Sequence, residues 1–380
     1  MFVCKRCGCD NQIYFGIKNG EKYCRRCIGF KGDEAKVIIS KKNKNIKPVL
    51  NYSLTKDQLN ISLKVKNAIE NNKNVLIYAV CGAGKTEIVF ETIAYALSRG
   101  LQVGFAIPRK DVVIELEPRL KEAFPSVDIV SVYGGNTSVL EGDIILLTTH
   151  QLYRYENYFD LLIIDETDAF PFSDNETLMN MFNNSIRGNY IMMSATPLDW
   201  MKEKIKKEDG IYLSLMKRHH GHPLIVPKIK IIPLYQSKYI IDKIKEYKKE
   251  NKPCFIFCPT INEAETLFNL LKLFFKDIRY VHSKKDDRQI IIDEFKKGRY
   301  QFLITTSVLE RGVTVKNLQV IVLNASHPIY NSETLIQISG RVGRKTDAFD
   351  GDVLFLAKKS TLFIENCVKK IKEANEYEPL

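Results

Sequence analysis

Short apolar runs alternate with segments of helical periodicity over most of this 380-residue chain. A first series of runs lies at 75–79, 103–107, 128–132, 143–149, 161–165 and 190–195. A second series lies at 228–232, 254–258, 278–283, 300–306, 320–324 and 352–357. Continuous apolar runs separated by helices are typical of parallel sheets covered on both faces. The pattern therefore predicts two successive α/β domains.

Two polar segments interrupt this alternation and predict the domain boundaries. Residues 31–50 end in the charged stretch SKKNKNIKP, which is typical of a linker. Residues 217–227 contain one glycine and two prolines and are interpreted as a hinge, with the three nearby histidines as polar hinge residues rather than metal ligands. We therefore expect a small N-terminal module at 1–30, a basic linker at 31–50, and α/β domains at 51–225 and 226–380.

The charge of the chain is positive and is concentrated near its start. The net charge is +12, from 57 basic and 45 acidic residues. Residues 1–50 contain twelve Lys or Arg against four Asp or Glu. This distribution favours a polyanionic partner, either nucleic acid or an anionic membrane face. Apolar stretches of about 20 residues are missing, and the N-terminus is charged, so we expect a cytosolic protein without a signal peptide or membrane span.

The sequence AVCGAGKT (79–86) follows the first apolar run and precedes a helical segment. Glycines in a strand-to-helix loop allow backbone N–H groups to surround phosphate oxygens, and the helix N-terminus adds positive potential. Lys85 is expected to reach the β- and γ-phosphates, and the Thr86 hydroxyl to ligate Mg²⁺. The usual pattern begins with Gly where this chain has Ala79. The predicted phosphate-binding residues are Gly82, Ala83, Gly84, Lys85 and Thr86.

Acidic and hydroxyl residues follow two later strands of the same predicted sheet. Asp165 ends the run at 161–165 and is the expected Mg²⁺ ligand, while Glu166 is expected to polarise the attacking water. Ser194 and Thr196 close the next strand. Their hydroxyls are expected to link the Mg²⁺ site to the second domain.

The second domain carries arginines in the segment QISGRVGR (337–344). Arg341 and Arg344 are three residues apart and would share one face of a helix or its end. An arginine presented to a γ-phosphate stabilises the charge of the transition state. Gln337 heads the same segment, and Gly312 lies upstream in a loop expected at the same rim. The chain is thus predicted to hydrolyse a nucleoside triphosphate.

Five of the nine cysteines lie within the first 30 residues. Cys4, Cys7, Cys24 and Cys27 form two Cys-x-x-Cys pairs, the spacing of a four-thiolate zinc ribbon. So short a module needs the metal for its folding. Cys9 could replace Cys7, but Cys7 is preferred because its pair mirrors the second one. Arginines beside these cysteines are suited to phosphate contacts.

In order and spacing, these motifs resemble those of superfamily 2 helicases over residues 51–357. The resemblance implies two tandem RecA-like P-loop domains that bind ATP and Mg²⁺ between them and track nucleic acid. It also implies that Gln58 in LTKDQ reads adenine. The nucleic-acid contacts that it implies are Arg109, Thr149, His150, His282 and Ser283.

A narrower likeness is to the ComFA family of late competence proteins. It lies in the four-cysteine ribbon, the acidic box followed by AFP (169–171), the ERGVT run (310–314) and QISGRVGR. This likeness implies an ATP-dependent translocase or helicase that moves single-stranded DNA into the cytoplasm during transformation. It also implies competence proteins at the membrane DNA-uptake channel as partners, and a peripheral position on the inner face of the cell membrane.

Three other functions remain as alternatives. The first is a replication-restart or repair DNA helicase, which shares the phosphate-loop style but is generally longer. The second is a DEAD-box RNA helicase, which usually has His where this chain has Gln337. The third is a zinc-dependent nucleic-acid adaptor that uses ATP as a switch, although the presence of Glu166, Arg341 and Arg344 favours turnover.

Overall fold

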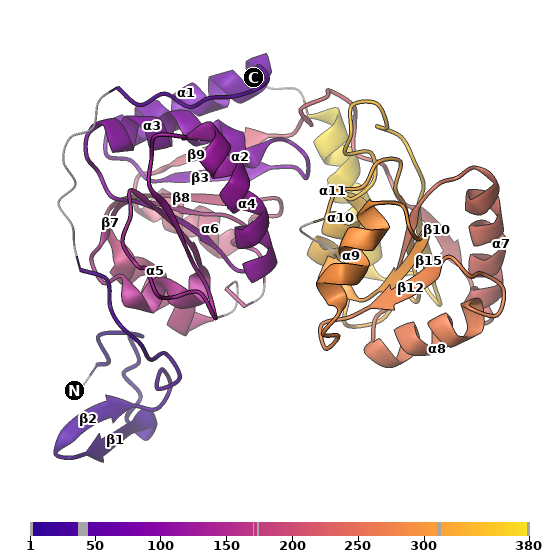
Figure 1. Cartoon of the computed structure of the whole chain (residues 1–380), viewed down its shortest axis with the longest axis horizontal. Coiled ribbons are helices and arrows are strands. Elements are labelled where there is room, and N and C mark those ends of the chain that lie inside the picture. The colour runs from indigo at the N-terminus through magenta and orange to yellow at the C-terminus, as the bar shows by residue number, and fades with distance from the viewer. Residues whose placement is uncertain (1–2, 37–44, 170, 173–174, 310–312, 378–380) are drawn as a thin grey trace. The chain divides into compact units, whose positions relative to one another are not determined.

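The computed structural model describes residues 3–36, 45–169, 171–172, 175–309 and 313–377. The chain divides into two compact units, the first made of 1–79 and 84–215 and the second of 80–83 and 216–380. Each unit contains one large sheet whose strands are all parallel, as the alternating pattern predicts. In Figure 1 the first unit runs from indigo to pink, and residues 216–380 of the second unit run from pink through orange to yellow.

The chain begins with a small antiparallel hairpin. The short helix η1 (Gln12–Tyr14) leads into β1 (Phe15–Lys18), which pairs with β2 (Glu21–Cys24). Asn19 and Gly20 connect the strands with φ angles of 52° and 81°. Such a two-residue turn with positive φ at both positions favours Asn-Gly. The hairpin therefore delivers Cys24 at a defined place at its end.

The sheet of the first unit has seven strands in the order β5-β6-β4-β7-β8-β3-β9. They are β3 (Val75–Ala79), β4 (Val103–Ile107), β5 (Ile129–Val132), β6 (Ile144–Thr148), β7 (Phe159–Ile164), β8 (Ile186–Ser194) and β9 (Ile211–Leu215). The sequence pattern did not predict β9. This strand lies at the sheet edge and leaves Tyr212 exposed, so it lacks the continuous apolar run of a central strand.

Helices lie on both faces of this sheet. They are α1 (Lys56–Glu70), α2 (Lys85–Ile88), α3 (Phe90–Ser98), α4 (Lys110–Ala123), η2 (Thr149–Arg154), α5 (Glu176–Ser185) and α6 (Asp199–Lys207). Figure 1 shows α1 and α3 on one side of the sheet and α5 and α6 on the other. Every residue of β4 and β6 is consequently buried.

The second unit repeats this architecture with six strands in the order β10-β15-β14-β11-β13-β12. The strands are β10 (Lys228–Ile231), β11 (Cys254–Phe257), β12 (Ile278–Val281), β13 (Phe302–Thr305), β14 (Gln319–Val322) and β15 (Val353–Ala357). The helices are α7 (Gln236–Lys249), α8 (Ile261–Leu271), α9 (Arg288–Lys296), η3 (Ser307–Leu309), α10 (Ser332–Ser339) and α11 (Leu362–Glu376). Among the described residues, every helix is too short or too polar to span a bilayer.

Candidate ATP, nucleic-acid and metal sites

The predicted phosphate loop connects β3 to α2, as the sequence indicates. Gly82 and Gly84 have φ angles of 84° and 77°, and Gly84 is the N-cap of α2. Residues with side chains rarely adopt this left-handed conformation, so both glycines are required by the turn. Lys85 and Thr86 open the helix and are half-buried. The loop can therefore surround phosphate oxygens with backbone N–H groups while Lys85 and Thr86 face the same ligand.

The helix α2 is anchored through Glu87, a residue that the sequence reasoning did not select. Its carboxylate is buried, accepts a hydrogen bond of 2.9 Å from Tyr52 Oη, and pairs with Arg119 of α4. Burial and the Glu87 charge together raise the pKa of Tyr52 to about 12. This network ties the helix that carries Lys85 to two other segments of the first unit.

Gln58, the predicted adenine contact, is buried beside the phosphate loop. Its backbone N–H donates to Thr55 Oγ1 at 3.2 Å, and its Oε1 accepts from the Thr55 N–H at 2.8 Å. This reciprocal pair is a capping box at the start of α1. A Cβ atom placed on Gly84 would meet Gln58 Nε2, so the amide lies directly against the loop.

Asp165 and Glu166 directly follow β7 and lie at the carboxyl edge of the sheet. The strand order β7-β8-β3 separates them from the phosphate loop by one strand, β8. Asp165 is buried, and its Oδ1 accepts the Glu166 N–H at 2.8 Å. Glu166 has a φ angle of 57°, which turns the chain sharply after the strand. Thr86 and Asp165 together offer the oxygen ligands that Mg²⁺ prefers, and the donor set fits that ion.

The hydroxyls of Ser194 and Thr196 bind a residue that the sequence reasoning did not select. Ser194 Oγ donates to Asp168 Oδ1 at 2.7 Å, and Thr196 Oγ1 donates to Asp168 Oδ2 at 2.8 Å. Ser194 Oγ also accepts the Thr196 N–H at 2.9 Å. The segment after β8 is thus fastened to the acidic box within the first unit, whereas we expected a link to the second domain. Asp168 completes the DETD box, which was the available signal for it.

We predict that Asp168→Ala weakens this fastening. Two buried hydroxyls would lose their acceptor, at a cost of about 1–3 kcal/mol in the free energy of unfolding of the first unit. The rate of ATP hydrolysis should fall as well, because the acidic box would no longer be tied to the end of β8. Denaturant unfolding and a phosphate-release assay measure these effects. Asp168→Asn keeps one acceptor oxygen, so its stability and activity should lie between those of the wild type and Asp168→Ala. Wild-type stability and activity of Asp168→Ala would contradict the role of Asp168 as the acceptor for both hydroxyls.

The arginines of the second unit lie after α10. Arg341 is buried and donates from Nη1 to the Val313 carbonyl at 2.8 Å. Arg344 is half-buried and donates from Nε to the Gly340 carbonyl at 2.8 Å. Gln337 is buried on α10 itself. Gly312, the remaining predicted residue of this rim, lies outside the described residues.

The predicted hinge supports the arginine segment. Arg218 is 2% exposed and donates from Nη1 to the carbonyls of Val342 and Gly343 at 2.9 and 2.6 Å. His220 Nε2 lies 2.9 Å from the same Gly343 carbonyl. Burial and the neighbouring Arg344 lower the pKa of Arg218 to about 10. His219 Nδ1 in turn lies 2.9 Å from the Gly82 carbonyl, and the interpretation of the three histidines as polar hinge residues stays a prediction.

The predicted nucleic-acid contacts of the first unit follow two neighbouring strands. Arg109 is the half-buried N-cap residue of α4 and lies two residues after the end of β4. Thr149 and His150 begin η2 directly after β6, which pairs with β4. The three residues therefore share the carboxyl edge of the sheet. Thr149 is fully buried, whereas His150 is half-buried and its pKa is lowered by burial.

The predicted contacts of the second unit follow β12. His282 is buried, its Nδ1 accepts the Lys284 N–H at 3.3 Å, and its Nε2 lies 3.5 Å from Glu265 Oε1. Ser283 is exposed beside it. Of the two, only Ser283 offers its side chain freely to a ligand on the surface.

Four of the N-terminal cysteines come together as the spacing predicts. The sulfur atoms of Cys4, Cys7, Cys24 and Cys27 all lie within 4.8 Å of one another. The pairs Cys4–Cys27 and Cys7–Cys24 are each 3.6 Å apart. Zinc–sulfur bonds of about 2.3 Å in a tetrahedron place the sulfurs about 3.8 Å apart, so the cluster fits Zn²⁺. Cys9 lies outside this group, and its sulfur points to the Asn11 carbonyl at 3.9 Å.

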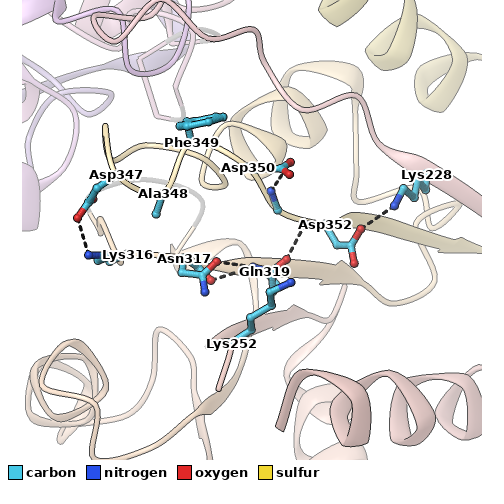
Figure 2. Close-up of a pocket in the computed structure, with 11 residues that line it drawn as sticks. Lys228, Lys252, Lys316, Asn317, Gln319, Asp347, Ala348, Phe349, Asp350 and Asp352 are labelled. Carbon is cyan, nitrogen blue, oxygen red and sulfur yellow. Dashed lines mark hydrogen bonds and ion pairs between the residues drawn. The ribbon is translucent and has the colours of Figure 1, made fainter. Parts of the chain in front are cut away.

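A cavity of about 510 Å³ in the second unit (Figure 2) lies beside the arginine segment, because its lining residue Phe349 lies against Gly343 and stacks on His222. It is lined by Lys228, Lys252, Lys316, Asn317, Gln319, Asp347, Ala348, Phe349, Asp350, Gly351 and Asp352. Two of its lysines are neutralised in ion pairs, Lys228 with Asp352 and Lys316 with Asp347. The cavity therefore does not present a strong site for an anion.

Two known families match this chain in sequence. The helicase conserved C-terminal domain matches residues 236–346, and the type III restriction enzyme res subunit matches residues 51–199. The first match contains Arg341 and Arg344, and the second contains the phosphate loop and the acidic box. Together they identify an ATPase with helicase domains.

Solved helicase structures share the fold. The chain matches Dbp5 of S. cerevisiae bound to RNA and ADP-BeF₃ with a TM-score of 0.63 and 17% identity, over 85% of this chain and 92% of that one. It matches RecG bound to a three-way DNA junction with a TM-score of 0.59 and 19% identity, over 86% of this chain and 45% of that one. At these identities the likeness establishes the RecA-like fold of both domains and nothing finer.

Two competence proteins are similar over nearly the whole chain. The chain is 35% identical to competence protein ComFA of Bacillus subtilis over 397 aligned positions, which cover 99% of this chain and 86% of that protein. It is 34% identical to competence protein ComFA of Streptococcus pneumoniae, over 98% of this chain and 90% of that protein. Taken with the helicase domains and the cysteine cluster, this similarity shows that the chain belongs to the ComFA family of competence proteins and has an ATP-dependent helicase role in competence.

Proposed function

We propose that this protein is an ATP-driven motor that moves along single-stranded DNA and draws it into the cytoplasm during transformation. The observation that carries the proposal is the carboxyl edge of the first sheet. The phosphate loop after β3, Asp165 after β7 and His150 after β6 all lie at that edge. A nucleotide site and a predicted strand contact on one rigid sheet can be coupled by small movements of the loops between them.

Bound ATP and Mg²⁺ supply the transferable phosphoryl group and the positive charge that neutralises it. Lys85 would hold the β- and γ-phosphates, and Thr86 and Asp165 would hold the metal ion. Glu166 orients the attacking water, and Gln58 reads the adenine ring. The sequence motifs of the second domain add Gln337 and Gly312 as proposed nucleotide contacts, and Arg341 and Arg344 would stabilise the charge that develops on the γ-phosphate.

The nucleic-acid strand is held at residues from both domains. Arg109 and His150 belong to the first domain, and Ser283 belongs to the second. The side chains of Thr149 and His282 are buried, so these two residues would support the contact surface and not touch the strand themselves. If ATP binding brings the domains together and hydrolysis releases them, the two sets grip the strand alternately. The net charge of +12 supports a polyanionic partner of this kind.

The proposal also includes the partners of the protein and its cellular site, and membership of the ComFA family supports this part of it. The strand would come from competence proteins at a membrane DNA-uptake channel. The motor would then work as a peripheral protein on the cytoplasmic face of the membrane. The basic residues of 1–50 support contact with anionic lipid headgroups as well as with DNA.

The decisive measurement is the ATPase rate with single-stranded DNA, duplex DNA and RNA of equal length at one salt concentration. We expect stimulation to be greatest with single-stranded DNA, because a motor acting on imported strands meets them without a complement. Stimulation by RNA alone would indicate an RNA helicase, and a preference for branched or duplex DNA would indicate a repair helicase. Binding of ATP without phosphate release would indicate an adaptor that uses ATP as a switch.

A further inference from the structure

The ring of Phe30 stacks on His150, the predicted strand contact of η2. The two ring centroids are 6.3 Å apart, and the ring planes differ by 20°. The edge of the same phenylalanine packs against Tyr153, also on η2, at 5.6 Å. Phe30 is tied to the cysteine module, because its N–H donates to the Cys27 carbonyl at 3.0 Å. One side chain therefore joins the metal-binding module to the nucleic-acid segment.

Hydrogen bonds also join η2 to the residues that follow Phe30 in the sequence. Tyr153 Oη donates to the Lys31 carbonyl at 2.6 Å, and Arg154 Nη1 donates to the Asp33 carbonyl at 2.6 Å. The Ala35 N–H donates back to the Arg154 carbonyl at 2.9 Å. The predicted linker thus begins as a segment bound along η2 in residues 31–35. A Cβ atom on Gly32, which has a φ angle of 143°, would collide with the buried guanidinium of Arg154.

The first cysteine knuckle is held by α5 at the same time. Asn180 Nδ2 donates to the Cys7 carbonyl at 2.8 Å, and Asn184 Nδ2 donates to the Lys5 carbonyl at 2.6 Å. Arg6, which lies between these two positions, donates from Nη1 to the Phe30 carbonyl at 2.8 Å. The five N-terminal cysteines share one apolar cluster with Phe182, Met181 and Leu152. The ribbon is therefore part of the first unit.

We propose that Phe30 is a positioning residue, through which the four-cysteine ribbon holds η2 and the His150 side chain in the orientation that contacts the DNA strand. This inference rests on the proposed role of His150. Without an ordered ribbon, Arg6 and Cys27 no longer place Phe30, and the imidazole loses the ring that limits its rotation. The metal then acts on DNA binding through η2, in addition to any contact made by the arginines of the ribbon.

The test compares Phe30→Leu, Phe30→Tyr and Gly32→Ala in the full-length protein. Phe30→Leu keeps apolar volume but removes the ring stack, and Gly32→Ala displaces Arg154. For both, we expect one zinc per chain, an unchanged KM for ATP, and about a 3- to 10-fold higher DNA concentration for half-maximal ATPase stimulation, the factor that corresponds to one lost aromatic pair. Phe30→Tyr should restore wild-type values. Ile17→Ala, at a position on β1 that is 71% exposed, is the matched control and should change none of these values.

Two further measurements test separately whether Phe30 orders η2 and whether His150 contacts DNA. They are hydrogen exchange of residues 149–155 and the ATPase stimulation of the variant His150→Ala. Faster exchange in Phe30→Leu, with zinc retained, supports the positioning role. Wild-type exchange and stimulation in Phe30→Leu would overturn it, as would loss of zinc, which would place Phe30 in the folding of the ribbon itself. His150→Ala could leave the ATPase stimulation by DNA unchanged while hydrogen exchange in Phe30→Leu is faster. In that case the proposed DNA contact at His150 is wrong, and the positioning of η2 by Phe30 is still supported.

Discussion

Lys85→Ala is expected to abolish DNA-stimulated ATP hydrolysis while leaving the fold intact. The side chain is half-buried at the start of α2, and the helix is independently anchored by Glu87 with Tyr52 and Arg119. Removing the ammonium group takes away the charge that would hold the β- and γ-phosphates. Loss of one preorganised donor of this kind lowers turnover by roughly 10²- to 10³-fold. Phosphate release with saturating single-stranded DNA measures the effect.

A control for this variant is available on the same unit. Lys64 lies exposed on α1, so Lys64→Ala removes the same charge far from the loop and should keep wild-type turnover. Circular dichroism and the thermal midpoint should agree for the wild type and both variants. Retained turnover in Lys85→Ala would show that the loop does not bind the hydrolysed phosphate, and the assignment of this chain's ATP site to 82–86 would be wrong.

Cys24→Ser is expected to release the metal and to weaken DNA binding more than nucleotide binding. The sulfur of Cys24 lies 3.6 Å from that of Cys7, within the four-sulfur cluster. A module of this size depends on its metal for folding, so the hairpin and the Phe30 contact should be lost together. We expect DNA affinity to fall by about tenfold or more, which corresponds to about 1.4 kcal/mol. The affinity for ATP should change little, because the ribbon packs on α5 and η2, whereas Lys85 lies on α2.

The same variant should lower the thermal midpoint of the first unit, because the cysteines pack into its apolar cluster with Phe182 and Met181. A loss of even about 2 kcal/mol shifts the midpoint by roughly 4–8 °C. Cys9→Ser is the matched control, since Cys9 is buried in the same module but lies outside the sulfur cluster. Loss of zinc from Cys9→Ser with retention in Cys24→Ser would contradict the ligand set. If the metal-free protein binds DNA with unchanged affinity, the ribbon has only a structural role and does not contribute to DNA binding.

Local patterns in the sequence were sufficient to predict both parallel sheets. Each predicted apolar run overlaps a strand of the structure, and central strands such as β4 and β14 are buried along their whole length because both faces of the sheet are covered. The edge strand β10 also overlaps its run, although it is largely exposed and contains two lysines. The glycines at 82 and 84 and the cysteine spacing were equally informative, since backbone conformation and metal geometry each demand particular residues at particular intervals. The edge strand β9 was missed because one of its faces meets solvent and its sequence is not continuously apolar.

The sequence by itself determined the fold class, the nucleotide chemistry and the four cysteines that gather into one cluster, because these depend on residues close together or on strand order. Tertiary structure alone revealed Asp168 as the partner of Ser194 and Thr196, and Arg218 as the support of the arginine segment. It also joined the ribbon to η2 through Phe30, across about 120 residues of sequence. Such pairs leave no spacing signal, since side chains distant in sequence meet only after the elements that carry them have packed.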